Sequence, residues 1–557
     1  MAWSTVFIAW STWTAILLLG VTGVLIHDVI LWKRMPPGPQ PLPFIGNKLD
    51  VPQKYPWIKF REWSRKYGPI YTVWFGRRPT VIISDPVVAV DLLEKRSHKY
   101  SSRPRFVVMG EIFWDMSSIL AQPYGKDWSV RRKALHSVLT QRALQHYKPV
   151  QEAEATRLCQ QLLQRAVPDD LDDLLNRYTA SIVFTIAYGH RIDSMQSPII
   201  RQRMKIMHWN ATVNVPGRYL AESFPFLKYV PDMFAPWKRE VKSWGLEEAA
   251  ANAQLLDYVR EDMENARKPG ARPLPNSLAK QLLEARAENP AAFALLRKRD
   301  FASLPSSVFG AGADTTASTL SSAILAIVTN QEALAAAHAE LDAVVGTDRL
   351  PAFTDEAALP YIRALCKEAL RWRPVAVLGG TPHASTEADV YQGYYIPKGT
   401  NILGNSWAIN LHEEYYPNPD RFNPLRFLDV DPHELGYLPP SYLASTRVET
   451  GRPHPSKLGH SSFGWGRRIC PGADLASNNL FIAVARMLWA FDIRPIKGVV
   501  YDTYNYTDGF NSRPNPFECE IMVRSQRHEE VLRAAFVDSQ DYLESNFPLF
   551  KEHEIVV

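Results

Sequence analysis

Cysteine is scarce in this sequence: only four of its 557 residues are cysteine, at positions 159, 366, 470 and 519. None of them belongs to a CxxC pair, which argues against a zinc cluster, and a disulfide framework is not expected in so long a chain. Cys159 and Cys366 are expected to be small buried residues, as free cysteines usually are. The role of Cys519 stays open, whereas Cys470 lies in a distinctive loop.

The chain also lacks a strong excess of charge of either sign, with 63 Lys and Arg against 58 Asp and Glu and a formal net charge of +5. A nucleic-acid-binding protein would concentrate basic residues, so no nucleic-acid partner is expected. A dinucleotide-binding fingerprint is missing as well. Gly310-Ala-Gly312 and Gly464-Trp-Gly466 both lack the third glycine, and neither follows a strand.

No charged side chain precedes Asp28, and residues 6–26 are mostly Ile, Leu, Val, Ala, Phe and Trp. Such a helix rises about 31 Å, which is enough to cross the core of a bilayer. Lys33 and Arg34 follow, which favours the cytosolic side for the rest of the chain. A cleaved signal peptide would need a basic start and an A-x-A-like site, and neither is present. Residues 1–34 are therefore predicted to be a membrane anchor in contact with lipid.

Residues 35–47 begin with Met35-Pro-Pro-Gly-Pro-Gln-Pro-Leu-Pro43, and its prolines prevent a continuous helix or a sheet strand. We predict a stiff, extended hinge that holds the body at a fixed tilt to the membrane. Chain length alone suggests roughly three or four domains. No linker divides residues 48–557, so we expect one catalytic unit there.

Hydrophobic periodicity predicts a mainly α-helical body with a small β part. Two β-rich runs at 70–74 and 80–84 are expected to form a hairpin, followed by a helix to about residue 95. Helices are expected at 127–140, 151–166, 170–189, 245–267, 303–345, 360–371 and 472–491. Short strands are expected at 389–402, few periodic signals mark 411–460, and strand-like pieces close the chain.

The loop Phe463-Gly-Trp-Gly-Arg-Arg-Ile-Cys-Pro-Gly472 holds a single cysteine directly before a helical pattern. Backbone N–H groups that glycine leaves uncovered can donate hydrogen bonds to a thiolate, and the positive end of the following helix favours the ionised sulfur. Both effects suit a sulfur that donates electrons to a metal. Gly466 and Gly472 permit close approach of the backbone to a flat cofactor, and Arg468 supplies a nearby cation.

This loop resembles the cytochrome P450 signature F-x-x-G-x-R-x-C-x-G at all its fixed positions, which are Phe463, Gly466, Arg468, Cys470 and Gly472. The resemblance runs from the proline hinge to about residue 524. Within the family, the sequence is most similar in general character to filamentous-fungal microsomal members of secondary metabolism. It implies the cytochrome P450 fold, preceded by a single N-terminal transmembrane helix. It also implies haem b (iron protoporphyrin IX), with Cys470 as the axial thiolate and with Phe463, Arg468 and Gly472 around the haem.

Two further motifs resemble the structural triad of the family. Glu368-Ala-Leu-Arg371 lies in a predicted helix, where its spacing places acid and base on one face. Pro424-Leu-Arg-Phe427 matches the later loop whose arginine completes the triad, although Leu425 stands where the family usually has an acid. The resemblance implies that Glu368, Arg371 and Arg426 hold the segment that presents the cysteine loop.

Ala311-Gly-Ala-Asp-Thr-Thr316 lies in a long apolar helical pattern, where polar residues are costly unless they find partners. Close helix packing is one explanation of its small residues. The family's A/G-G-x-D/E-T-T/S motif explains all of its positions. By that resemblance Ala311 and Gly312 border the haem and leave room for dioxygen, and Asp314 relays protons. Thr315 would hold the oxygen species and its waters, with Thr316 as a possible substitute.

Trp128 and Arg132 are one helical turn apart and match the family's W-x-x-x-R, which contacts the haem propionates. His383, in Thr381-Pro-His-Ala384, resembles a further propionate contact, and Arg468 would be another. A buried propionate edge needs such donors. A histidine by itself is more often a satisfied polar residue, so both interpretations of His383 stay open.

The substrate pocket is expected to draw on residues 101–122, on the long helix, on 375–380 and on 507–511. Ser307, Ala311 and Thr315 recur at helical spacing and should face one cavity. Aromatic, aliphatic and small residues suit a large apolar substrate, such as a polyketide, terpenoid or alkaloid. The pocket residues predicted individually are Ser307, Gly310, Val375, Val377 and Leu378.

The resemblance implies a monooxygenase that inserts one oxygen atom of dioxygen into an apolar small molecule. It also implies a single-pass protein of the endoplasmic reticulum membrane with a cytosolic catalytic domain. Electrons would come from NADPH through a flavoprotein reductase, docked on Lys126, Arg131, Lys133 and Arg467. A merely solvated basic face is the alternative for these four residues.

Other functions are carried as alternatives. A family member could catalyse a rearrangement, desaturation or coupling, but members that use no external electrons commonly lose the acid–alcohol pair that Asp314 and Thr315 supply here. A haem-binding sensor would not need that pair either. A constitutive sterol demethylase is not favoured, because the substrate-region motifs associated with that group are missing.

Overall fold

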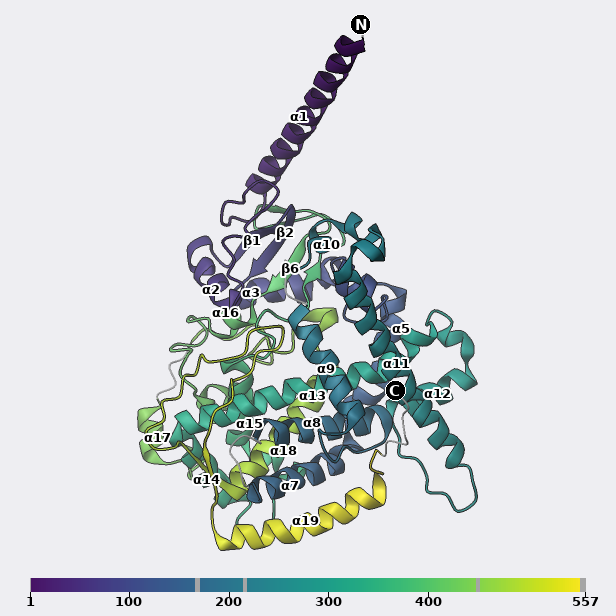
Figure 1. The fold of residues 1–557 in the computed structure, drawn as a ribbon. Helices are drawn as coiled ribbons and strands as arrows, with labels where there is room; N and C mark the ends of the chain where they lie inside the picture. The colour runs from purple at the N-terminus through teal and green to yellow at the C-terminus, as the bar shows by residue number, and fades with distance from the viewer. Residues whose placement is uncertain (1, 166–170, 214–217, 447–450, 551–557) are drawn as a thin grey trace.

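The computed structural model describes residues 2–165, 171–213, 218–446 and 451–550. A long helix, α1 (Ala2–Arg34), projects from a broad and mainly helical body (Figure 1). Within it, Thr12–Arg34 form a stretch of 23 residues that is long and apolar enough to cross a membrane. The helix therefore has the length and composition of the predicted anchor.

The last turns of α1 are fastened to the body. The carboxylate of Asp28 accepts two hydrogen bonds from the guanidinium of Arg77, at 2.7 and 2.9 Å. Leu31 and Trp32 pack against a buried hydrophobic cluster to which Met35 belongs. These contacts set the direction in which the helix leaves the body.

The proline-rich segment 35–47 lies along the first strand, β1 (Ile70–Phe75). The N–H of Thr72 donates to the carbonyl of Pro37 at 2.8 Å. A Cβ on Gly38 would overlap the carbonyl oxygen of Thr72, so the approach requires glycine. The segment is thus attached to the edge of the sheet instead of spanning open solvent.

The predicted β part is present as small sheets. In the largest, β1 and β2 (Arg78–Ile83) form the expected antiparallel hairpin, β2 pairs in parallel with β6 (Asn401–Gly404), and β6 pairs antiparallel with β3 (His383–Ala384). The other pairs are β4 (Asp389–Tyr391) with β5 (Tyr394–Ile396) and β7 (Phe491–Arg494) with β8 (Glu520–Val523). The hairpin thus confirms the prediction for residues 70–84.

The centre of the body is the long helix α13 (Lys298–Thr329), which Figure 1 shows crossing the molecule. It packs against α8 (Leu171–Tyr188), α11 (Pro236–Asn265), α15 (Pro360–Trp372) and α18 (Ala473–Ala490). A helix covered on several sides is apolar nearly all round, which explains its sequence. Pro305 is accommodated inside the helix, not at its start.

The remaining helices surround this centre. Those before α13 are α2 (Pro56–Tyr67), α3 (Pro86–Ala89), α4 (Ser97–Tyr100), α5 (Lys126–Leu139), α6 (Gln141–Gln145), α7 (Lys148–Leu163), α9 (Pro198–Val213), α10 (Leu220–Ser223) and α12 (Leu278–Glu288). Those after it are α14 (Gln331–Val344), α16 (Ser406–Asn410), α17 (Pro440–Ser445) and α19 (Gln526–Asn546). The short π and 3-10 turns are η1 (Val90–Lys95), η2 (Val107–Phe113), η4 (Pro225–Tyr229), η5 (Asp232–Phe234), η6 (Pro290–Phe293), η7 (Phe353–Ala358), η8 (Pro424–Phe427) and η9 (Gly466–Arg468).

The single helix expected over 303–345 is wrong, because the chain bends by 105° between α13 and α14. Asn330 lies at the bend with φ −134° and ψ 71°. Its side-chain amide donates to the carbonyl of Ala326 at 2.8 Å and so satisfies one of the free carbonyls at the end of α13. The helical spacing of apolar residues continues across Asn330, the C-cap of α13, so the sequence pattern does not reveal the bend.

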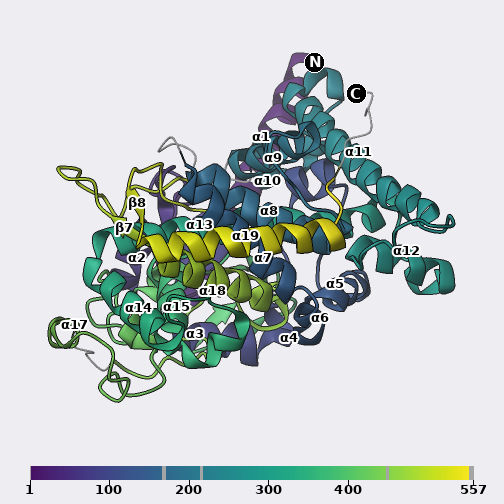
Figure 2. The same cartoon turned by 90° about the horizontal axis from the view of Figure 1, so that it is seen from below.

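The expectation that strand-like pieces close the chain is also incomplete. After β8 the chain forms α19, a helix that lies across α7 and α18 (Figures 1 and 2). Few of its side chains are buried, among them His528, Leu532 and Leu543. A helix with so narrow an apolar face has a weak periodic signal.

Candidate functional site

The path of the cysteine loop depends on glycine. Gly466 has a φ of 56°, in the left-handed region, and a Cβ there would overlap the carbonyl oxygen of Leu93 in η1. Both conditions require glycine. The N–H of Cys470 donates to the carbonyl of Phe463 at 2.8 Å, which closes the loop directly before α18.

Cys470 differs from the other cysteines because it is exposed, whereas Cys159, Cys366 and Cys519 are buried. The surrounding protein nevertheless raises the pKa of the Cys470 thiol by burial, against the opposing effects of a hydrogen bond from the Gly472 N–H and the charge of Arg132. The side chain thus lies at the wall of an internal space, reachable but shielded from bulk water. A metal cation at the sulfur would reverse this balance and hold the thiolate.

Two arginines flank the loop. Arg132 of α5 donates to the carbonyl of Ile469 at 2.7 Å, directly before Cys470. The guanidinium of Arg468 lies over the Trp128 ring at 4.5 Å and donates to two backbone carbonyls at 2.7 Å. The structure therefore brings Trp128, Arg132 and Arg468 together, from a helix and a loop that are far apart in sequence.

A third cation, Arg103, was not predicted individually. It lies in the stretch 101–122 and donates to the carbonyls of Thr381 and Pro382. Burial and the neighbouring charge of Arg468 lower the pKa of Arg103 to about 9. Burial and Arg132 lower the pKa of Arg468 to about 9 as well. The two shifts show that the three guanidinium groups lie close enough to repel one another.

No carboxylate forms an ion pair with any of these three arginines in the described part of the chain. A buried charge without an opposite charge is costly, so such clusters are usually completed by an anion. The cluster therefore fits a group that carries carboxylates, next to a cysteine that fits a metal.

His383 is 4% exposed and lies on β3, with Nδ1 at 2.7 Å from the carbonyl oxygen of Tyr100. A carbonyl only accepts, so Nδ1 carries the proton of this contact. Burial, with the charges of Arg103 and Arg468, lowers the pKa of His383 to about 3. The ring is therefore neutral in the free chain, and its Nε2 donates to a carboxylate only if the charge of that carboxylate raises the pKa of the ring enough to protonate it.

On α13 the exposed positions are grouped. Ala311 is exposed, and Ser307, Gly310 and Thr315 are partly exposed, on a helix whose other residues are mostly buried. A Cβ on Gly310 would meet no atom within 4 Å. Ser307, Gly310, Ala311 and Thr315 thus form a stripe along α13 that faces open space, as the spacing of Ser307, Ala311 and Thr315 predicts.

Gly312 lies where α13 packs against α8. A Cβ on Gly312 would overlap the side chain of Val183 in α8. The hydroxyl of Thr179 on the same helix donates to the carbonyl of Ala313 at 2.5 Å. The missing side chain of Gly312 therefore permits close packing of α13 and α8, and its role in leaving room for dioxygen stays a prediction.

Asp314 is held by the loop that follows Tyr506. The amide of Asn511 donates to its carboxylate at 2.9 Å, and the Arg513 guanidinium lies 3.8 Å away. Arg513 also acts on Asp172 at the start of α8, where burial raises the pKa of the carboxyl and Arg513 opposes that shift. Asp314 thus lies near Arg513, whose charge also acts on Asp172, and this group of charged residues is separate from the exposed positions Ser307, Gly310 and Ala311.

Thr315 and Thr316 have different surroundings. Thr315 keeps part of its surface exposed, and its hydroxyl donates to the carbonyl of Ala311 at 2.8 Å. Thr316 is only 5% exposed. Successive helical residues point about 100° apart, so the two hydroxyls do not share a face. Thr316 is therefore a poor substitute for Thr315.

The three members of the expected triad meet. Arg371 donates to both carboxylate oxygens of Glu368, at 2.6 and 2.7 Å, and both residues are 0% exposed. Arg426 lies 3.7 Å from the same carboxylate, and the N–H of Asn423 donates to it at 2.8 Å. α15 is thereby tied to η8, in the segment that precedes the cysteine loop.

The residues expected to line a substrate pocket divide into two groups. Val377 is 1% exposed and belongs to a hydrophobic cluster with Trp57 and Trp407, so its assignment to the pocket is wrong. Leu378 also packs against that cluster. Val375 lies next to the 507–513 loop, because its carbonyl accepts from the N–H of Ser512 at 2.9 Å.

The predicted basic docking surface also requires a correction. Lys126, Lys133 and Arg467 are exposed. Arg131 is only 2% exposed and forms a buried ion pair with Asp300 at 3.3 Å. Arg131 lies one turn from Trp128 on the inner face of α5, and it ties that helix to the first turn of α13.

Comparison with known proteins identifies this arrangement. The family model described as Cytochrome P450 matches residues 36–521. A protein named cytochrome P450 monooxygenase 58 from Postia placenta is 36% identical over 498 residues, which cover 88% of this chain and 89% of that protein. A cytochrome P450 monooxygenase of Armillaria gallica is 36% identical over 514 residues, covering 90% and 92%.

Further matches are more distant. Cytochrome P450 monooxygenase verL of Clonostachys rogersoniana is 32% identical over 519 residues, covering 91% of this chain and 90% of that one. Among solved structures, a zebrafish cytochrome P450 with abiraterone superposes with a TM-score of 0.65 at 24% identity, covering 84% of this chain and all of that one. That likeness shows the fold.

Proposed function

Because the chain belongs to the cytochrome P450 family, whose members are haem-thiolate monooxygenases, we propose that it inserts one oxygen atom of dioxygen into an apolar small molecule with electrons from an NADPH-dependent flavoprotein reductase. The observation that carries the proposal is the pairing of an accessible Cys470 with three partly buried guanidinium groups, of Arg103, Arg132 and Arg468, that lack a carboxylate partner among the described residues. Haem b is complementary to both, since it offers iron to a thiolate and two propionates to cations.

Each residue near the cysteine loop has a distinct task in this proposal. Cys470 binds the iron, with the Gly472 N–H and the Arg132 charge supporting its thiolate form. Arg103, Arg132 and Arg468 hold the propionates, and their pKa values rise again when the carboxylates arrive. The carboxylates also raise the pKa of His383, which then donates through Nε2.

Haem, when bound, supplies the activation of dioxygen and the oxidation of the substrate C–H bond, and the protein supplies position and protons. The stripe of Ser307, Ala311 and Thr315 faces the reaction space. The Thr315 hydroxyl orients a proton donor there, and Asp314 passes protons to it from the side of Asn511 and Arg513. Neither role is needed for haem binding alone, which favours an oxygenase over a sensor.

Electrons are proposed to enter from the side of α5. Lys126 and Lys133 lie exposed on that helix, and Arg467 lies exposed on the cysteine loop and stacks on Tyr124 at 5.1 Å. Positive charge this close to Cys470 suits an acidic face of a reductase. Arg131 takes no part, since its charge is paired with Asp300.

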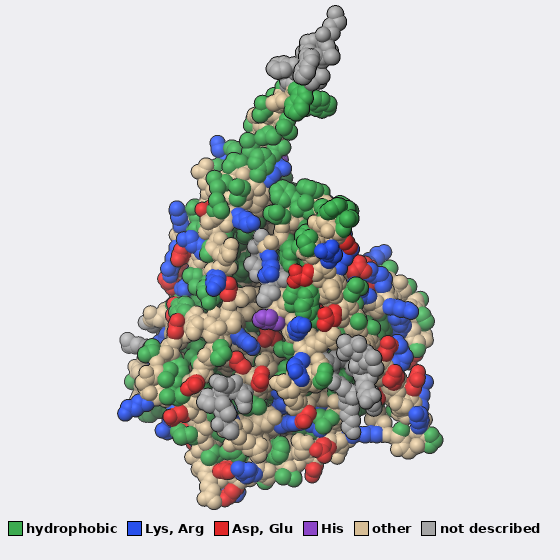
Figure 3. All heavy atoms as spheres, in the orientation of Figure 1, with side chains coloured by type: hydrophobic (Ala, Val, Ile, Leu, Met, Phe, Trp, Pro, Cys, Tyr) green, Lys and Arg blue, Asp and Glu red, His purple; other side chains and the backbone are tan. Residues whose placement is uncertain are grey.

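We assign the protein to the cytosolic face of the endoplasmic reticulum membrane, with α1 as the anchor. Hydrophobic side chains cover the part of α1 next to the body and gather on the surface beside its base, over α10 (Figure 3). The exposed apolar residues of that patch are Leu220, Phe224, Phe226, Tyr229, Met233 and Phe234. Patch and anchor lie at one end of the molecule, so both can contact the same bilayer.

The substrate is proposed to be a fungal secondary metabolite of low polarity, such as a polyketide, terpenoid or alkaloid. The stripe on α13 consists of Gly310, Ala311 and the hydroxyl residues Ser307 and Thr315, and none of these side chains is charged. Metabolite profiling of a deletion strain identifies the compound that accumulates.

The function is tested with purified protein, a fungal NADPH-dependent reductase and isotopically labelled dioxygen. One labelled oxygen atom is expected in the product of that compound. Cys470→Ser is expected to abolish both the label and the red-shifted Soret band of the reduced carbon monoxide complex. Retention of that band by the variant contradicts the assignment of Cys470.

A further inference from the structure

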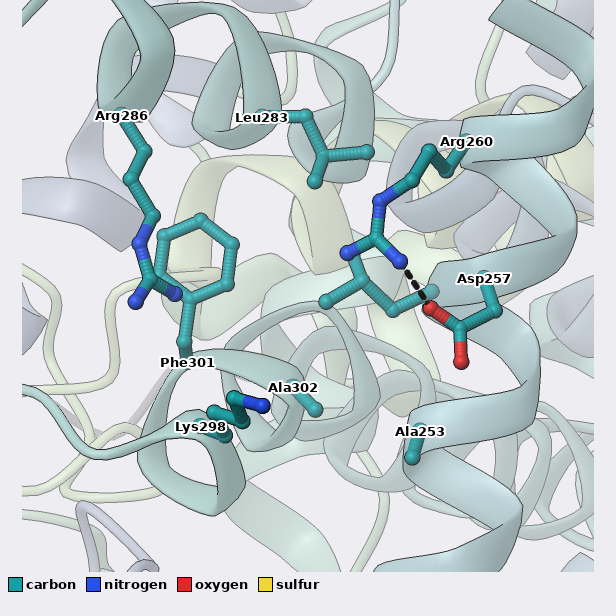
Figure 4. Close-up of a pocket in the computed structure, with 9 residues that line it drawn as sticks. Ala253, Asp257, Arg260, Leu283, Arg286, Lys298, Phe301 and Ala302 are labelled. Carbon is teal, nitrogen blue, oxygen red and sulfur yellow. Dashed lines mark hydrogen bonds and ion pairs between the residues drawn. The ribbon is translucent and has the colours of Figure 1, made fainter.

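A pocket that none of the features above uses lies between α11, α12 and the first turn of α13, and Figure 4 shows it. Its volume is about 430 Å³. The apolar residues that line it are Ala253, Leu256, Leu283, Phe301 and Ala302. The charged residues that line it are Asp257, Arg260, Arg286 and Lys298. A space of this size matches sites that hold small organic ligands.

The charges around the pocket do not cancel. Asp257 pairs with Arg260, one turn away on α11. Arg286 lies over the Phe301 ring at 4.7 Å, and a guanidinium that stacks by its face can still donate from its N–H edge. Lys298 approaches from the third side, and Figure 4 shows these cationic groups around one space. Within the described residues neither Arg286 nor Lys298 has an ion-pair partner.

We propose that this pocket binds a free amphipathic monocarboxylate of the fatty-acid type. Its carboxylate lies between Arg286 and Lys298, the two positive groups that Asp257 leaves unmatched. Its alkyl chain lies on Leu256, Leu283 and the apolar face around Phe301. A planar guanidinium fixed on an aromatic ring is already oriented to donate to both oxygens of one carboxylate.

The position of the pocket indicates where the ligand comes from. Figure 1 places α12 on the flank of the body, away from α1 and α10. A membrane phospholipid at the anchored end does not reach this flank. The proposed ligand is therefore a free acid and not a phospholipid of the membrane that α1 is proposed to enter.

The pocket is also connected to the helices of the proposed active site. Lys298, Phe301 and Ala302 belong to the first turns of α13, where Asp300 forms its buried ion pair with Arg131 of α5. A carboxylate bound by Lys298 contacts this turn and so stabilises it. The pocket thereby adjoins the junction of α5 and α13.

The test uses the full-length holoenzyme, with its haem-side substrate space filled by a saturating tight-binding azole. Decanoate is then titrated in by isothermal calorimetry. We expect one saturable site, and we expect Arg286→Glu and Lys298→Glu each to raise the Kd at least about tenfold. Ala253→Trp, which fills the pocket without changing its charge, is expected to abolish binding.

Matched controls make the same charge changes outside the pocket, at Arg267→Glu and Lys268→Glu in the loop after α11. These controls are expected to bind decanoate like the unaltered protein. The proposal is overturned if the controls weaken binding as much as the pocket variants, if methyl decanoate binds as tightly as decanoate, or if no binding occurs. The carbon monoxide spectrum of every variant is recorded alongside, so that loss of this site and loss of haem-thiolate ligation are told apart.

Discussion

The side-chain amide of Asn511 donates a hydrogen bond of 2.9 Å to the carboxylate of Asp314. The residues are 197 positions apart in the chain, one on the central helix and one on the loop before β8. Arg513, two residues further along that loop, lies 3.8 Å from the same carboxylate. The loop therefore controls which way the carboxylate points, and with it the proposed entry of protons.

The first prediction concerns this control. Asp314→Asn is expected to slow NADPH consumption and product formation together by about tenfold or more, because one route supplies both with protons. Asn511→Ala leaves the acid in place but frees its orientation, so we expect a smaller loss of rate. Stopped-flow kinetics with excess reductase measures both, and Asn515→Ala on the same loop is the control. Unchanged turnover in Asp314→Asn contradicts the relay.

The second prediction separates the two threonines. Thr315→Ala keeps a good helix former, so the fold and the thiolate spectrum are expected to stay normal. Product formed per NADPH is expected to fall several-fold, with hydrogen peroxide rising to match. A tenfold loss of coupling corresponds to about 1.4 kcal/mol between two protonation routes. Thr316→Ala is expected to leave coupling unchanged, because Thr316 is buried on another face. Equal effects of the two substitutions would falsify the assignment.

The third prediction concerns the cation that the motifs did not reveal. Arg103→Leu removes one of the three guanidinium groups beside the cysteine loop and, with it, the repulsion on Arg468. The haem-free protein is therefore expected to lose little stability. Haem is expected to dissociate faster, by about tenfold for the loss of one charge-assisted pair of hydrogen bonds. Transfer of haem to apomyoglobin measures the rate, and Arg105→Leu, an exposed neighbour, is the control.

The fourth prediction concerns truncation. Removal of residues 1–26 is expected to weaken membrane binding and to leave haem content and thermal stability unchanged, because that part of α1 lies outside the body. Removal of residues 1–34 also takes away Asp28, Leu31 and Trp32, which bind Arg77 and a buried cluster. This longer truncation is expected to lower stability by about 1–3 kcal/mol. Flotation assays and thermal melts compare the two forms, and identical melts contradict the contacts at the base of α1.

The fifth prediction concerns the docking of the reductase. Lys126→Glu and Lys133→Glu are expected to slow the first electron transfer several-fold at low salt, and less at high salt, since screening weakens such steering. Lys497→Glu makes the same charge change beyond β7, which Figure 2 places on the opposite side from α5. It is expected to have no effect. If the control slows transfer equally, net charge and not a docking surface is responsible.

Several features of the protein follow from local sequence alone. The apolar N-terminal helix, the β1–β2 hairpin and the family membership each depend on residues close together in the chain, such as the uncharged run before Asp28 and the loop from Phe463 to Gly472. Some missed elements had a usable signal as well. Trp57, Phe60 and Trp63 recur every third residue and are the buried face of α2.

What the tertiary structure decided is the partner of each side chain. Arg131 and Arg132 are adjacent and identical in chemistry, yet one is paired with Asp300 and the other lies beside Cys470, because successive helical positions face different neighbours. Gly312 packs against Val183 for the same reason, while Gly310 faces open space. Arg103 joins Arg468 across 365 positions, a proximity that no local pattern encodes. A motif specifies which groups are present, and only the packing of distant helices specifies which of them share a low-dielectric space and change one another's charge.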